Sequence, residues 1–466
     1  MNSSRQALKS GVWYTLSNFL VKSIGFITTP IFTRLLTKED FGLYNNYLSW
    51  LAIITIIVTF NLDSTLISAR YDFENKFDEY ILSILTLSSI STVFWIVIVY
   101  IFPSFFIELL GMSTTYINAM FLYLFFIPAI TLFQTRERYF FEYKKTVATS
   151  VFLSISTAII SVVLVINLNN KFFGRVIGSI VPTIVLGIIF YIYFIRKGKK
   201  VRVQYWKYAL PICLPFIPHL LSLNVLNSMD KVMITKWCGA EDNALYSLAY
   251  TCGSMVTLLM TSMNSAFAPW IGEKLNSKDY KQIKQFSKIY ISSFSLLAIG
   301  IMAVAPEVLW ILGGNNYIEA KYVMTPIAMG CVCQFLYTMF VNIEQFKKKT
   351  IGMAVASVVA ALVNYILNCV FIPRYGYVAA AYTTLVGYLC LLIIHMFLVY
   401  KLKLDKVYDY KMITITVILI FIITMGMSIL YSYTIIRYAI FGVYLIFLIM
   451  ITLKHKDKIL SVIKRR

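Results

Sequence analysis

The strongest constraint on the fold is an internal repeat, in which two segments 202 residues apart share one pattern. Residues 33–44 are TRLLTKEDFGLY, and residues 235–246 are TKWCGAEDNALY. In both segments a basic residue, an acidic pair and a tyrosine occupy the same places between two long apolar runs. We therefore expect each segment to be a short, solvent-exposed connection between two membrane helices.

Four further matches follow in the same order along the chain. They pair Leu110-Gly111 with Leu312-Gly313, 116–119 with 317–320, Glu142 with Glu344, and 173–176 with 375–378, at offsets of 201 or 202. The constant order and spacing predict two copies of one structural unit. We expect an N-terminal lobe at 1–200, a C-terminal lobe at 201–404 and an appended segment at 405–466.

Composition indicates that both copies lie in a membrane. Hydrophobic residues make up 59% of the chain and charged residues only 14%. A water-soluble protein of this size exposes enough surface to carry a larger fraction of polar residues. Runs such as 48–60 and 413–425 contain no charge. Long apolar runs favour membrane-spanning helices over a β-barrel, which alternates polar and apolar residues in segments of about ten.

A length of about 20 residues per crossing predicts fourteen transmembrane helices. They lie near 11–33, 41–67, 79–102, 116–135, 147–167, 173–195, 208–235, 243–270, 287–312, 320–342, 350–372, 377–400, 410–431 and 436–453. The predicted fold class is thus an all-α integral membrane protein with two six-helix lobes and two extra C-terminal helices. Because each lobe has an even number of helices, both enter the membrane the same way up, and a pseudo-two-fold axis along the membrane normal relates them.

Prolines predict one interrupted span. Pro211, Pro215 and Pro218 all fall in the span at 208–235. Proline frees backbone carbonyls and kinks helices, so this span should be bent or broken near the end at which it enters the membrane.

Lysine and arginine predict the orientation. The connections on the side of the N-terminus carry 32 of these residues, and the connections on the other side carry 8. Positive residues concentrate on the cytoplasmic side of membrane proteins, so both termini are expected in the cytoplasm. This bias explains the net charge of +21 without nucleic acid, which is not an expected partner.

No catalytic or cofactor motif is recognisable. The chain has no Walker A glycine-lysine loop, no GxSxG and no HExxH. Its seven cysteines form no CxxC pair and its three histidines have no ligand spacing, so they are more typical of packing residues than of a metal set. We expect neither an enzyme nor a bound metal or cofactor, and ATP-driven transport would need a partner chain.

Lys22 is the sharpest functional candidate. Counted from Gly11 it lies about 16 Å deep, near the membrane midplane, where an ionisable group is costly. Asn224 is its counterpart at the 202 offset, and Asn18 and Asn227 extend the two polar stripes. The stripes are expected to line a cavity between the lobes, with Lys22 binding an anion. The alternative is a structural ion pair.

Three further residues are candidates. Asp230 and Lys231 are adjacent in the seventh span and are expected to couple lobe movement or to contact substrate, or else to form a local ion pair. Arg70 lies near the cytoplasmic end of the second span and is expected to guide an anionic headgroup, or else to be an ordinary positive anchor.

Three segments resemble a known family. Arg34-Leu-Leu-Thr-Lys-Glu-Asp-Phe-Gly-Leu-Tyr44, Asp230-Lys231 and Ala244-Leu-Tyr-Ser-Leu-Ala249 are similar to polysaccharide (O-antigen or capsule) repeat-unit flippases of the Wzx type. These belong to the multidrug/oligosaccharidyl-lipid/polysaccharide exporter superfamily. The resemblance covers nearly the whole chain, including the six-plus-six-plus-two helix count.

The resemblance implies a bacterial cytoplasmic-membrane protein that flips undecaprenyl-pyrophosphate-linked glycan by alternating access, driven by an ion gradient or the membrane potential. Its implied partners are that glycan, membrane lipids and the polysaccharide polymerase machinery. A cation-coupled multidrug exporter is less favoured, because such proteins place an acidic residue where this chain has Lys22. A lipid II flippase and a non-transporting scaffold of polysaccharide assembly stay open. A polymerase is disfavoured, since no long outer loop is expected.

Overall fold

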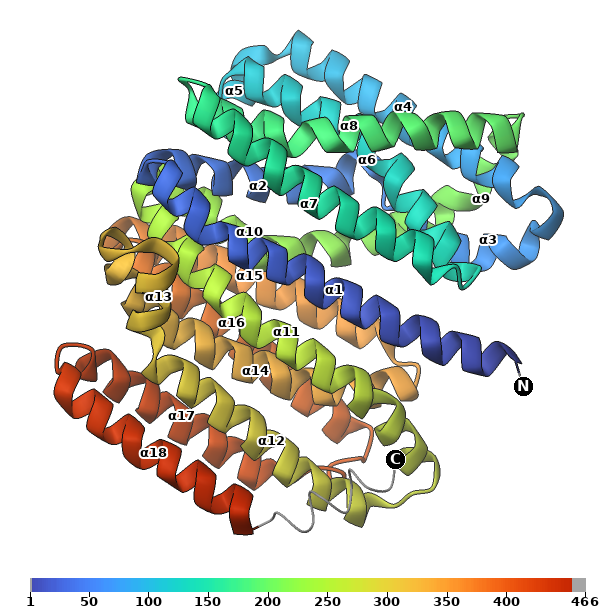
Figure 1. The fold of residues 1–466 in the computed structure, drawn as a ribbon. Helices are drawn as coiled ribbons and strands as arrows, with labels where there is room; N and C mark the ends of the chain where they lie inside the picture. The colour runs from blue at the N-terminus through green and yellow to red at the C-terminus, as the bar shows by residue number, and fades with distance from the viewer. Residues whose placement is uncertain (1, 455–466) are drawn as a thin grey trace.

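The structure, a computed structural model, describes residues 2–454, and the regular structure in that range is helical (Figure 1). We call the end of the bundle where α1 begins the terminal face and the end where α1 finishes the far face. The first half contains α1 (Asn2–Leu35), α2 (Lys38–Thr59), η1 (Leu62–Thr65), α3 (Leu66–Asp72), η2 (Glu74–Lys76), α4 (Phe77–Ile101), α5 (Pro103–Leu110), α6 (Thr114–Tyr139), α7 (Tyr143–Asn167) and α8 (Lys171–Gly198).

The second half repeats this order. It contains α9 (Val203–Cys213), η3 (Leu214–Phe216), α10 (Ile217–Trp237), α11 (Ala240–Asn276), α12 (Tyr280–Ala303), α13 (Ala305–Gly313), η4 (Asn315–Ala320), α14 (Lys321–Phe346), α15 (Thr350–Tyr375) and α16 (Tyr377–Lys401). Two more helices, α17 (Tyr410–Leu430) and α18 (Thr434–Lys454), follow. The predicted all-α membrane fold with about fourteen spans is confirmed.

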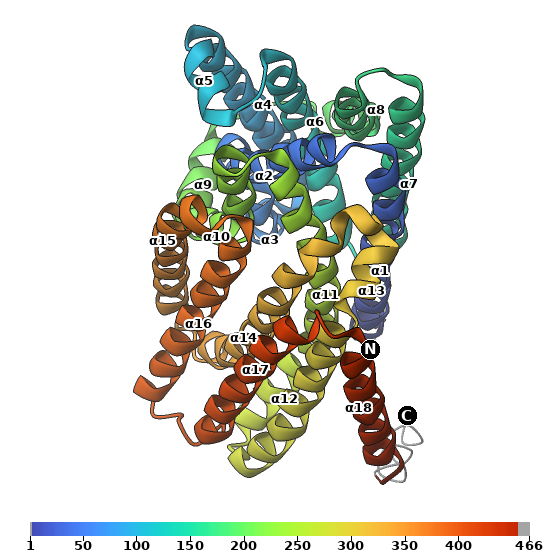
Figure 2. The same ribbon diagram turned by 90° about the vertical axis from the view of Figure 1, so that its left-hand side faces the viewer.

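Equivalent helices pack in the same pairs in both halves. Helix α8 lies against α6 and α7, as α16 lies against α14 and α15, and α1 packs on α7 as α10 packs on α15. Viewed from the far face, α4 to α8 gather in one half of the molecule and α10 to α17 in the other (Figure 2). Helices α2 and α11 meet between them.

The offset between the copies is not constant. Helices α2 and α11 begin 202 residues apart, but α6 and α14 begin 207 apart, because η4 has no counterpart between α5 and α6. The expected pairing of Glu142 with Glu344 is therefore wrong, and Glu137 is the counterpart of Glu344. The pairing of 173–176 with 375–378 is wrong for the same reason, since α8 and α16 begin 206 apart. The pairing of 116–119 with 317–320 is also wrong, because 116–119 lie in α6 and 317–320 lie in η4.

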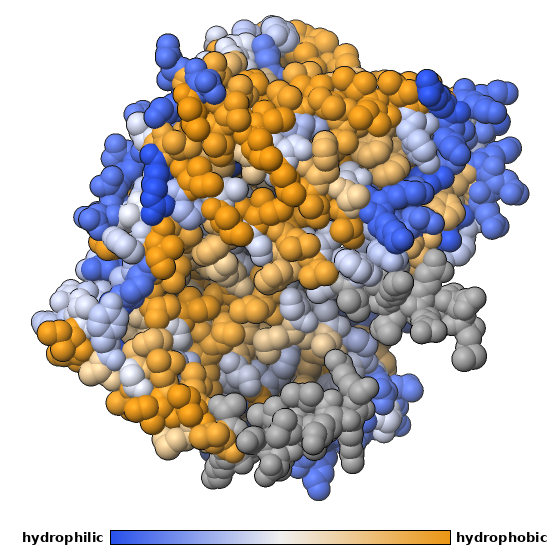
Figure 3. All heavy atoms as spheres, viewed as in Figure 1, coloured by the Kyte–Doolittle hydropathy of each residue, from blue (hydrophilic) through white to orange (hydrophobic). Residues whose placement is uncertain are grey.

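Apolar surface surrounds the bundle between its two polar ends. Twelve helical segments within the described range are long and apolar enough to cross a membrane, and α18 adds the shorter apolar stretch Thr434–Met450. On the face shown in Figure 3, hydrophobic residues form a broad band, with hydrophilic residues gathered toward the far and terminal faces. This is the distribution that a bilayer requires of its lipid-facing helices.

Two predicted spans end earlier than expected. The second span, expected at 41–67, ends as α2 at Thr59, because Phe60 and Asn61 adopt left-handed backbone angles. The ninth span, expected at 287–312, divides into α12 and α13 at Val304. A polar N-cap fixes the start of α2, where the Thr37 hydroxyl accepts the amide of Asp40 at 3.0 Å.

The proline-rich span is broken as predicted. Pro211, Pro215 and Pro218 divide it into α9, the short 3₁₀ segment η3 and α10. Helix α9 packs on the first half, where Tyr205 contacts the rings of Phe73 and Tyr80. Helix α10 packs on α15 in the second half. The chain therefore passes from one half to the other at η3.

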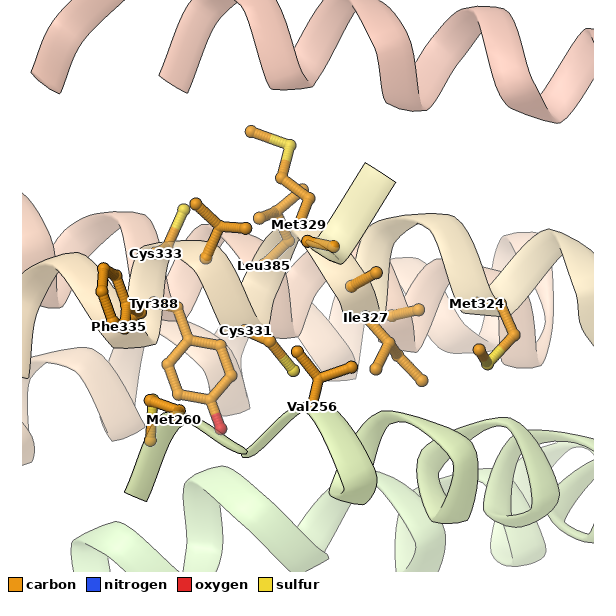
Figure 4. Close-up of a cluster of buried hydrophobic side chains, with 14 of the residues drawn as sticks. Val256, Met260, Met324, Ile327, Met329, Cys331, Cys333, Phe335, Leu385 and Tyr388 are labelled. Carbon is orange, nitrogen blue, oxygen red and sulfur yellow. The ribbon is translucent and has the colours of Figure 1, made fainter. Parts of the chain in front are cut away.

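The two halves have differently organised cores. The second half is built on one continuous buried cluster, part of which Figure 4 shows, with Val256 and Met260 of α11 facing Ile327 and Cys331 of α14 and Tyr388 of α16. Most buried residues of the first half form two separate clusters, one toward the terminal face that includes α9 and one toward the far face. Four others join the cluster of the second half, namely Phe32, Leu36, Phe41 and Val165.

The appended helices attach to the second half. Arg437 of α18 is ion-paired with Glu307 of α13 at 2.5 Å and donates to the Ala303 carbonyl at 2.8 Å. At the terminal face Asp409 caps α17 and lies 3.2 Å from the ammonium nitrogen of Lys288 on α12.

Candidate functional site

Helix α11 lies between two cavities, one in each half, and its Ser254 lines both. The N-lobe cavity has a volume of about 460 Å³. Its walls come from α1, α2, α8 and α11. Its lining residues are Phe19, Lys22, Ser23, Gly25, Phe26, Thr28, Thr29, Phe32, Phe41, Tyr44, Asn45, Leu48, Arg175, Thr251, Ser254, Met255, Leu258 and Leu259.

The C-lobe cavity has a volume of about 400 Å³ and lies between α10, α11, α14 and α16. Its polar lining is richer than that of the N-lobe cavity, with two tyrosines, amides and hydroxyls. Its lining residues are Asn227, Ser228, Lys231, Tyr250, Gly253, Ser254, Thr257, Met260, Thr261, Pro326, Ile327, Gly330, Cys331, Gln334, Ala381, Thr384, Leu385 and Tyr388.

Lys22 lines the N-lobe cavity from α1, and its side chain is exposed there. The lining contains no aspartate or glutamate, and no ion pair of Lys22 occurs within residues 2–454. An unpaired ammonium at this depth is costly unless water or an anion reaches it. The cavity is therefore suited to an anionic group.

Arg175 is the second cation of this cavity, and the sequence reasoning missed it. Its guanidinium carbon lies 3.7 Å from the ring centroid of Phe32 and 4.4 Å from that of Tyr44. The Nη1 atom is buried and has no hydrogen-bond partner in the described part of the chain. Stacking on both rings fixes the guanidinium plane while leaving a donor unsatisfied. Its position inside the predicted span 173–195 was the available signal, because arginine is rare there.

The N-lobe cavity is closed toward the far face by α2 and α11. A Cβ atom placed on Gly42 would lie 1.8 Å from the carbonyl oxygen of Ala240, so only glycine permits this approach. The buried Asn243 side chain donates to the Gly42 carbonyl at 2.8 Å. These contacts join the two repeated connections of the sequence to each other.

A second closure joins α1 to α13. The Thr33 hydroxyl donates to the Leu312 carbonyl at 2.5 Å, and Arg34 donates to the Ile311 carbonyl at 3.1 Å. The last carbonyls of a helix lack partners within the helix, so α13 offers these acceptors to α1. Both closures lie at the far face. Nearer the terminal face, α11 leaves Thr261, Ser262 and Ser265 exposed.

Asp230 faces away from both cavities and into the interior of the second half. Its carboxylate is fully buried and accepts hydrogen bonds from Tyr246 at 2.6 Å, from Asn368 at 2.5 Å and from Thr384. Asn368 also accepts from Thr383 and donates to Asn364. The cluster joins α10, α11, α15 and α16. Of these residues Thr384 also lines the C-lobe cavity.

Asn227 and Lys231 lie on a different side of α10 from Asp230 and line the C-lobe cavity. The Asn227 carbonyl accepts from Tyr388 at 2.7 Å and from Tyr250 at 3.2 Å. The Lys231 ammonium lies 4.9 Å from the ring centroid of Tyr250. The adjacent residues Asp230 and Lys231 thus lie in different surroundings and form no ion pair with each other.

The structure does not bring the other candidates into these cavities. Asn18 is exposed on α1. Asn224 donates to the Leu220 carbonyl of its own helix. Neither residue lines either of the two cavities. Arg70 lies in α3 instead of the second span, with its guanidinium carbon 4.7 Å from the ring centroid of Phe140. The early end of α2 moves Arg70 away from the cavities.

Among the described residues no group of three or more histidine, cysteine, aspartate or glutamate side chains is placed to hold a metal ion. The Asp230 cluster has a different composition, with one carboxylate among amide and hydroxyl oxygens. Oxygen ligands of this kind suit a hard monovalent cation or a proton.

Two similar helical halves, each with a polar cavity, and a closure at one face define the class of this protein as a membrane transporter fold. The structure is similar to that of the lipid II flippase MurJ in an inward closed conformation, with a TM-score of 0.72 and 14% identity over 96% of this chain and all of that chain. It is also similar to an inward-facing multidrug resistance MATE family transporter of the MOP superfamily, with a TM-score of 0.62 and 14% identity over 83% of this chain and 95% of that one.

The chain belongs to the polysaccharide biosynthesis protein family, whose profile matches residues 7–275, more than half of its length. The MatE profile matches 215–370. An uncharacterized membrane protein of Methanocaldococcus jannaschii is 22% identical, over 90% of this chain and 89% of the relative. The Lsg locus putative protein 1 of Haemophilus influenzae is 21% identical, over 85% and 99%. A probable low-salt glycan biosynthesis flippase of Haloferax volcanii is 23% identical over 36% of each chain.

Proposed function

We propose that this protein is a flippase that moves undecaprenyl-pyrophosphate-linked oligosaccharide repeat units from the inner to the outer leaflet of a bacterial cytoplasmic membrane. The proposal places both termini, and hence the terminal face, in the cytoplasm. The observation that carries it is the N-lobe cavity, in which Lys22 and Arg175 occur without an acidic residue in the described lining. Membership of the polysaccharide biosynthesis family supports a glycan carrier as the source of the anion.

Lys22 and Arg175 can bind a pyrophosphate one after the other, because they lie at different depths in the cavity. Phe32, on which Arg175 stacks, follows Lys22 by ten residues, or about 15 Å of helix. Lysine binds phosphate as a point charge, and arginine binds it with paired donors. A headgroup entering from the terminal face would meet Lys22 first and Arg175 next. The order of contacts gives the headgroup a path toward the far face.

Alternating access follows from the two closures at the far face. Opening there requires that α2 separate from α11 and that α1 leave α13, which breaks the Asn243–Gly42 and Thr33–Leu312 hydrogen bonds. The polar residues of α11 exposed toward the terminal face provide the entrance in the present state.

We assign ion coupling to Asp230. A buried carboxylate held by neutral donors lacks a counter-charge, and binding of a proton or a sodium ion supplies one. The cluster spans α10, α11, α15 and α16, so a change in its occupancy alters how α10 packs. Through α10, which also packs on α2, the change reaches the far-face closure.

The test uses purified protein in proteoliposomes with lipid-linked oligosaccharide isolated from a strain that lacks the protein. The fraction that becomes accessible to a membrane-impermeant oxidant of sugars measures flipping. We expect flipping by the unaltered protein and at least tenfold loss in Lys22→Ala and in Arg175→Ala. Lys281→Ala, which removes an exposed lysine of α12, is the matched control and should leave the rate unchanged.

Two outcomes would replace this proposal. Efflux of a cationic dye without movement of the lipid-linked glycan favours a multidrug exporter. Equal movement of lipid II and of the oligosaccharide carrier favours a lipid II flippase. Full flipping by Lys22→Ala and Arg175→Ala would remove the cavity from the mechanism altogether.

A further inference from the structure

The two halves contain the same buried carboxylate at the terminal-face end of equivalent helices. Glu137 of α6 and Glu344 of α14 are each 1% exposed. The backbone carbonyl of each accepts an amide five residues later at 2.9 Å, and each is followed four residues later by a residue with positive φ, Phe141 and Lys348. The turn and its glutamate are therefore duplicated structural features, 207 residues apart.

In the first half, permanent cations neutralise this carboxylate. The Arg136 guanidinium lies 2.5 Å from one oxygen of Glu137, and the Lys145 ammonium lies 3.1 Å from the other. Arg136 is also paired with Asp78 of α4 at 2.7 Å. Both cations stay charged throughout the physiological pH range. A carboxylate at a helix C-terminus is disfavoured by the helix dipole and by burial, and the two cations offset this cost at every pH at which the protein works.

In the second half, both cations are absent. At the 207 offset the counterpart of Arg136 is Ile343 and that of Lys145 is Gly352. The space at Gly352 is taken by Leu398 of α16, whose methyl carbon would lie 3.1 Å from an added Cβ. Neither position can supply a charge to Glu344, although the carboxylate and its burial are retained.

Histidine takes the place of these cations. Nδ1 of His395 on α16 lies 2.8 Å from Oε1 of Glu344, and the ring is 2% exposed. Oε2 of Glu344 is buried without a hydrogen-bond partner in the described chain. Histidine is the side chain whose charge ordinarily changes between pH 5 and 8. The pair is neutral overall when it shares a proton and carries an uncompensated negative charge when the proton leaves.

Among the groups around this pair, the proton shared by His395 and Glu344 is the charge that can change with pH. Tyr337 of α14 stacks on the His395 ring at 5.5 Å, and α15 presents Gly352 beside Leu398. The first residue of α17, Tyr410, donates its hydroxyl to the Met396 carbonyl. Four basic side chains nearby, all exposed to solvent, are Lys347, Lys348, Lys349 and Lys401. Within the described residues, Glu344 is the ion-pair partner of His395.

We infer that His395 and Glu344 form a proton-binding site that fastens α14 to α16 near the terminal face. The exposed turn that follows Glu344 gives the proton a short path from solution. Tyr337 also stacks on Tyr388 at 6.5 Å, and Tyr388 lines the C-lobe cavity. The bound proton therefore stabilises the helix pair that forms one wall of that cavity. In the first half, the equivalent carboxylate is instead paired with permanent cations of α6 and α7.

The inference is tested on the full-length protein in lipid nanodiscs by hydrogen exchange measured at pH 5.5 and pH 8.0. Rates are converted to protection factors so that the intrinsic pH dependence of exchange is removed. Protection of residues 340–346 should fall about tenfold at the higher pH, which is the effect of losing one charge-assisted hydrogen bond between the two helices. Protection of residues 133–139 should change less than twofold.

Two variants make the test specific. His395→Gln keeps a polar group without a titratable charge, and Glu344→Gln removes the carboxylate. Each should show the same protection of 340–346 at both pH values. If His395→Gln fails to fold, the result for Glu344→Gln alone decides whether the inference holds. Loss of protection that is equal in 133–139, or a pH response that survives in Glu344→Gln, overturns the inference. Because no substrate is used, the result does not depend on whether the flippase proposal holds.

Discussion

The two lobes are built from one pattern, yet their first helices behave differently. Helix α10 is packed on α2, α11 and α15, and it buries Asp230 completely. Helix α1 packs mainly on α7 and leaves Lys22 exposed to a cavity. The core of the second half is continuous, whereas that of the first half is divided into two clusters. The duplicated unit thus has two cations lining a cavity in one lobe and a buried carboxylate in the other.

The largest expected effect concerns the two lysines that line the cavities. Lys22→Ala should weaken binding of undecaprenyl pyrophosphate by about 10- to 100-fold, the value of one lost charge-assisted hydrogen bond. Lys231→Ala should weaken it by less than about threefold, because the Lys231 ammonium already lies over the Tyr250 ring. Binding is measured by calorimetry in detergent. Equal losses in both variants would abolish the proposed difference between the cavities.

The next effect separates binding from coupling. Asp230→Asn keeps a hydrogen-bonding side chain but removes the charge. It should leave binding of undecaprenyl pyrophosphate within about twofold and should abolish acceleration of flipping by an imposed proton or sodium gradient. Proteoliposomes with either gradient identify the ion. If the variant still responds to both gradients, Asp230 is not the coupling site.

A smaller effect concerns the far-face closure. Gly42→Ala places a methyl group against the Ala240 carbonyl and should lower the free energy of unfolding by about 1–3 kcal/mol. Gly272→Ala is the matched control, since an added Cβ there meets nothing within 4 Å and alanine favours a helix interior. Thermal unfolding should therefore show a lower midpoint for the first variant and an unchanged or higher midpoint for the second.

The smallest effect concerns the attachment of the appended helices to the second lobe. The Met412 amide, followed by Lys288 and Lys284, lowers the pKa of Asp409 below its ordinary value. A lowered pKa contributes stability that is present above the ordinary range and is lost as the pH falls through the lowered value. Because the group is near the surface, its contribution is below about 1 kcal/mol.

Unfolding midpoints measured at pH 7 and below pH 4 test this attachment. The midpoint of Asp409→Asn should lie slightly below that of the unaltered protein at pH 7, and the two should converge at the acidic pH. A constant difference between them would show that the carboxylate charge contributes nothing.

Much of the fold could be predicted because a membrane allows only a few arrangements of the backbone. The spans follow from the length of each apolar run, and the break between α9 and α10 follows from three prolines. The early end of α2 could not be predicted, since Phe60 and Asn61 adopt left-handed angles with no glycine to signal them. The insertion of η4 was also hidden, because chance matches kept the apparent offset near 202.

The candidate site was less predictable for a geometric reason. Depth along a helix can be counted from the sequence, and counting alone drew attention to Lys22. Rotation about the helix axis depends on packing, so the sequence could not show that Asp230 faces the interior and Lys231 faces the C-lobe cavity. Arg175 was counted with the basic residues of the outer connections, although it falls near the start of the predicted span 173–195. Helix α8 begins at Lys171, four residues before Arg175, and places it inside the bundle.

The break at η3 has a mechanical consequence. Helix α9 packs in the first half, and α10 packs on α15 of the second half as well as on α2. The rocking of the lobes that we propose would turn about the few residues between Pro211 and Pro218. A pivot at this point gives the motion a fixed fulcrum partway along what would otherwise be a single span. Small rotations there become larger displacements at the far face, some twenty residues, or about 30 Å, away along α10.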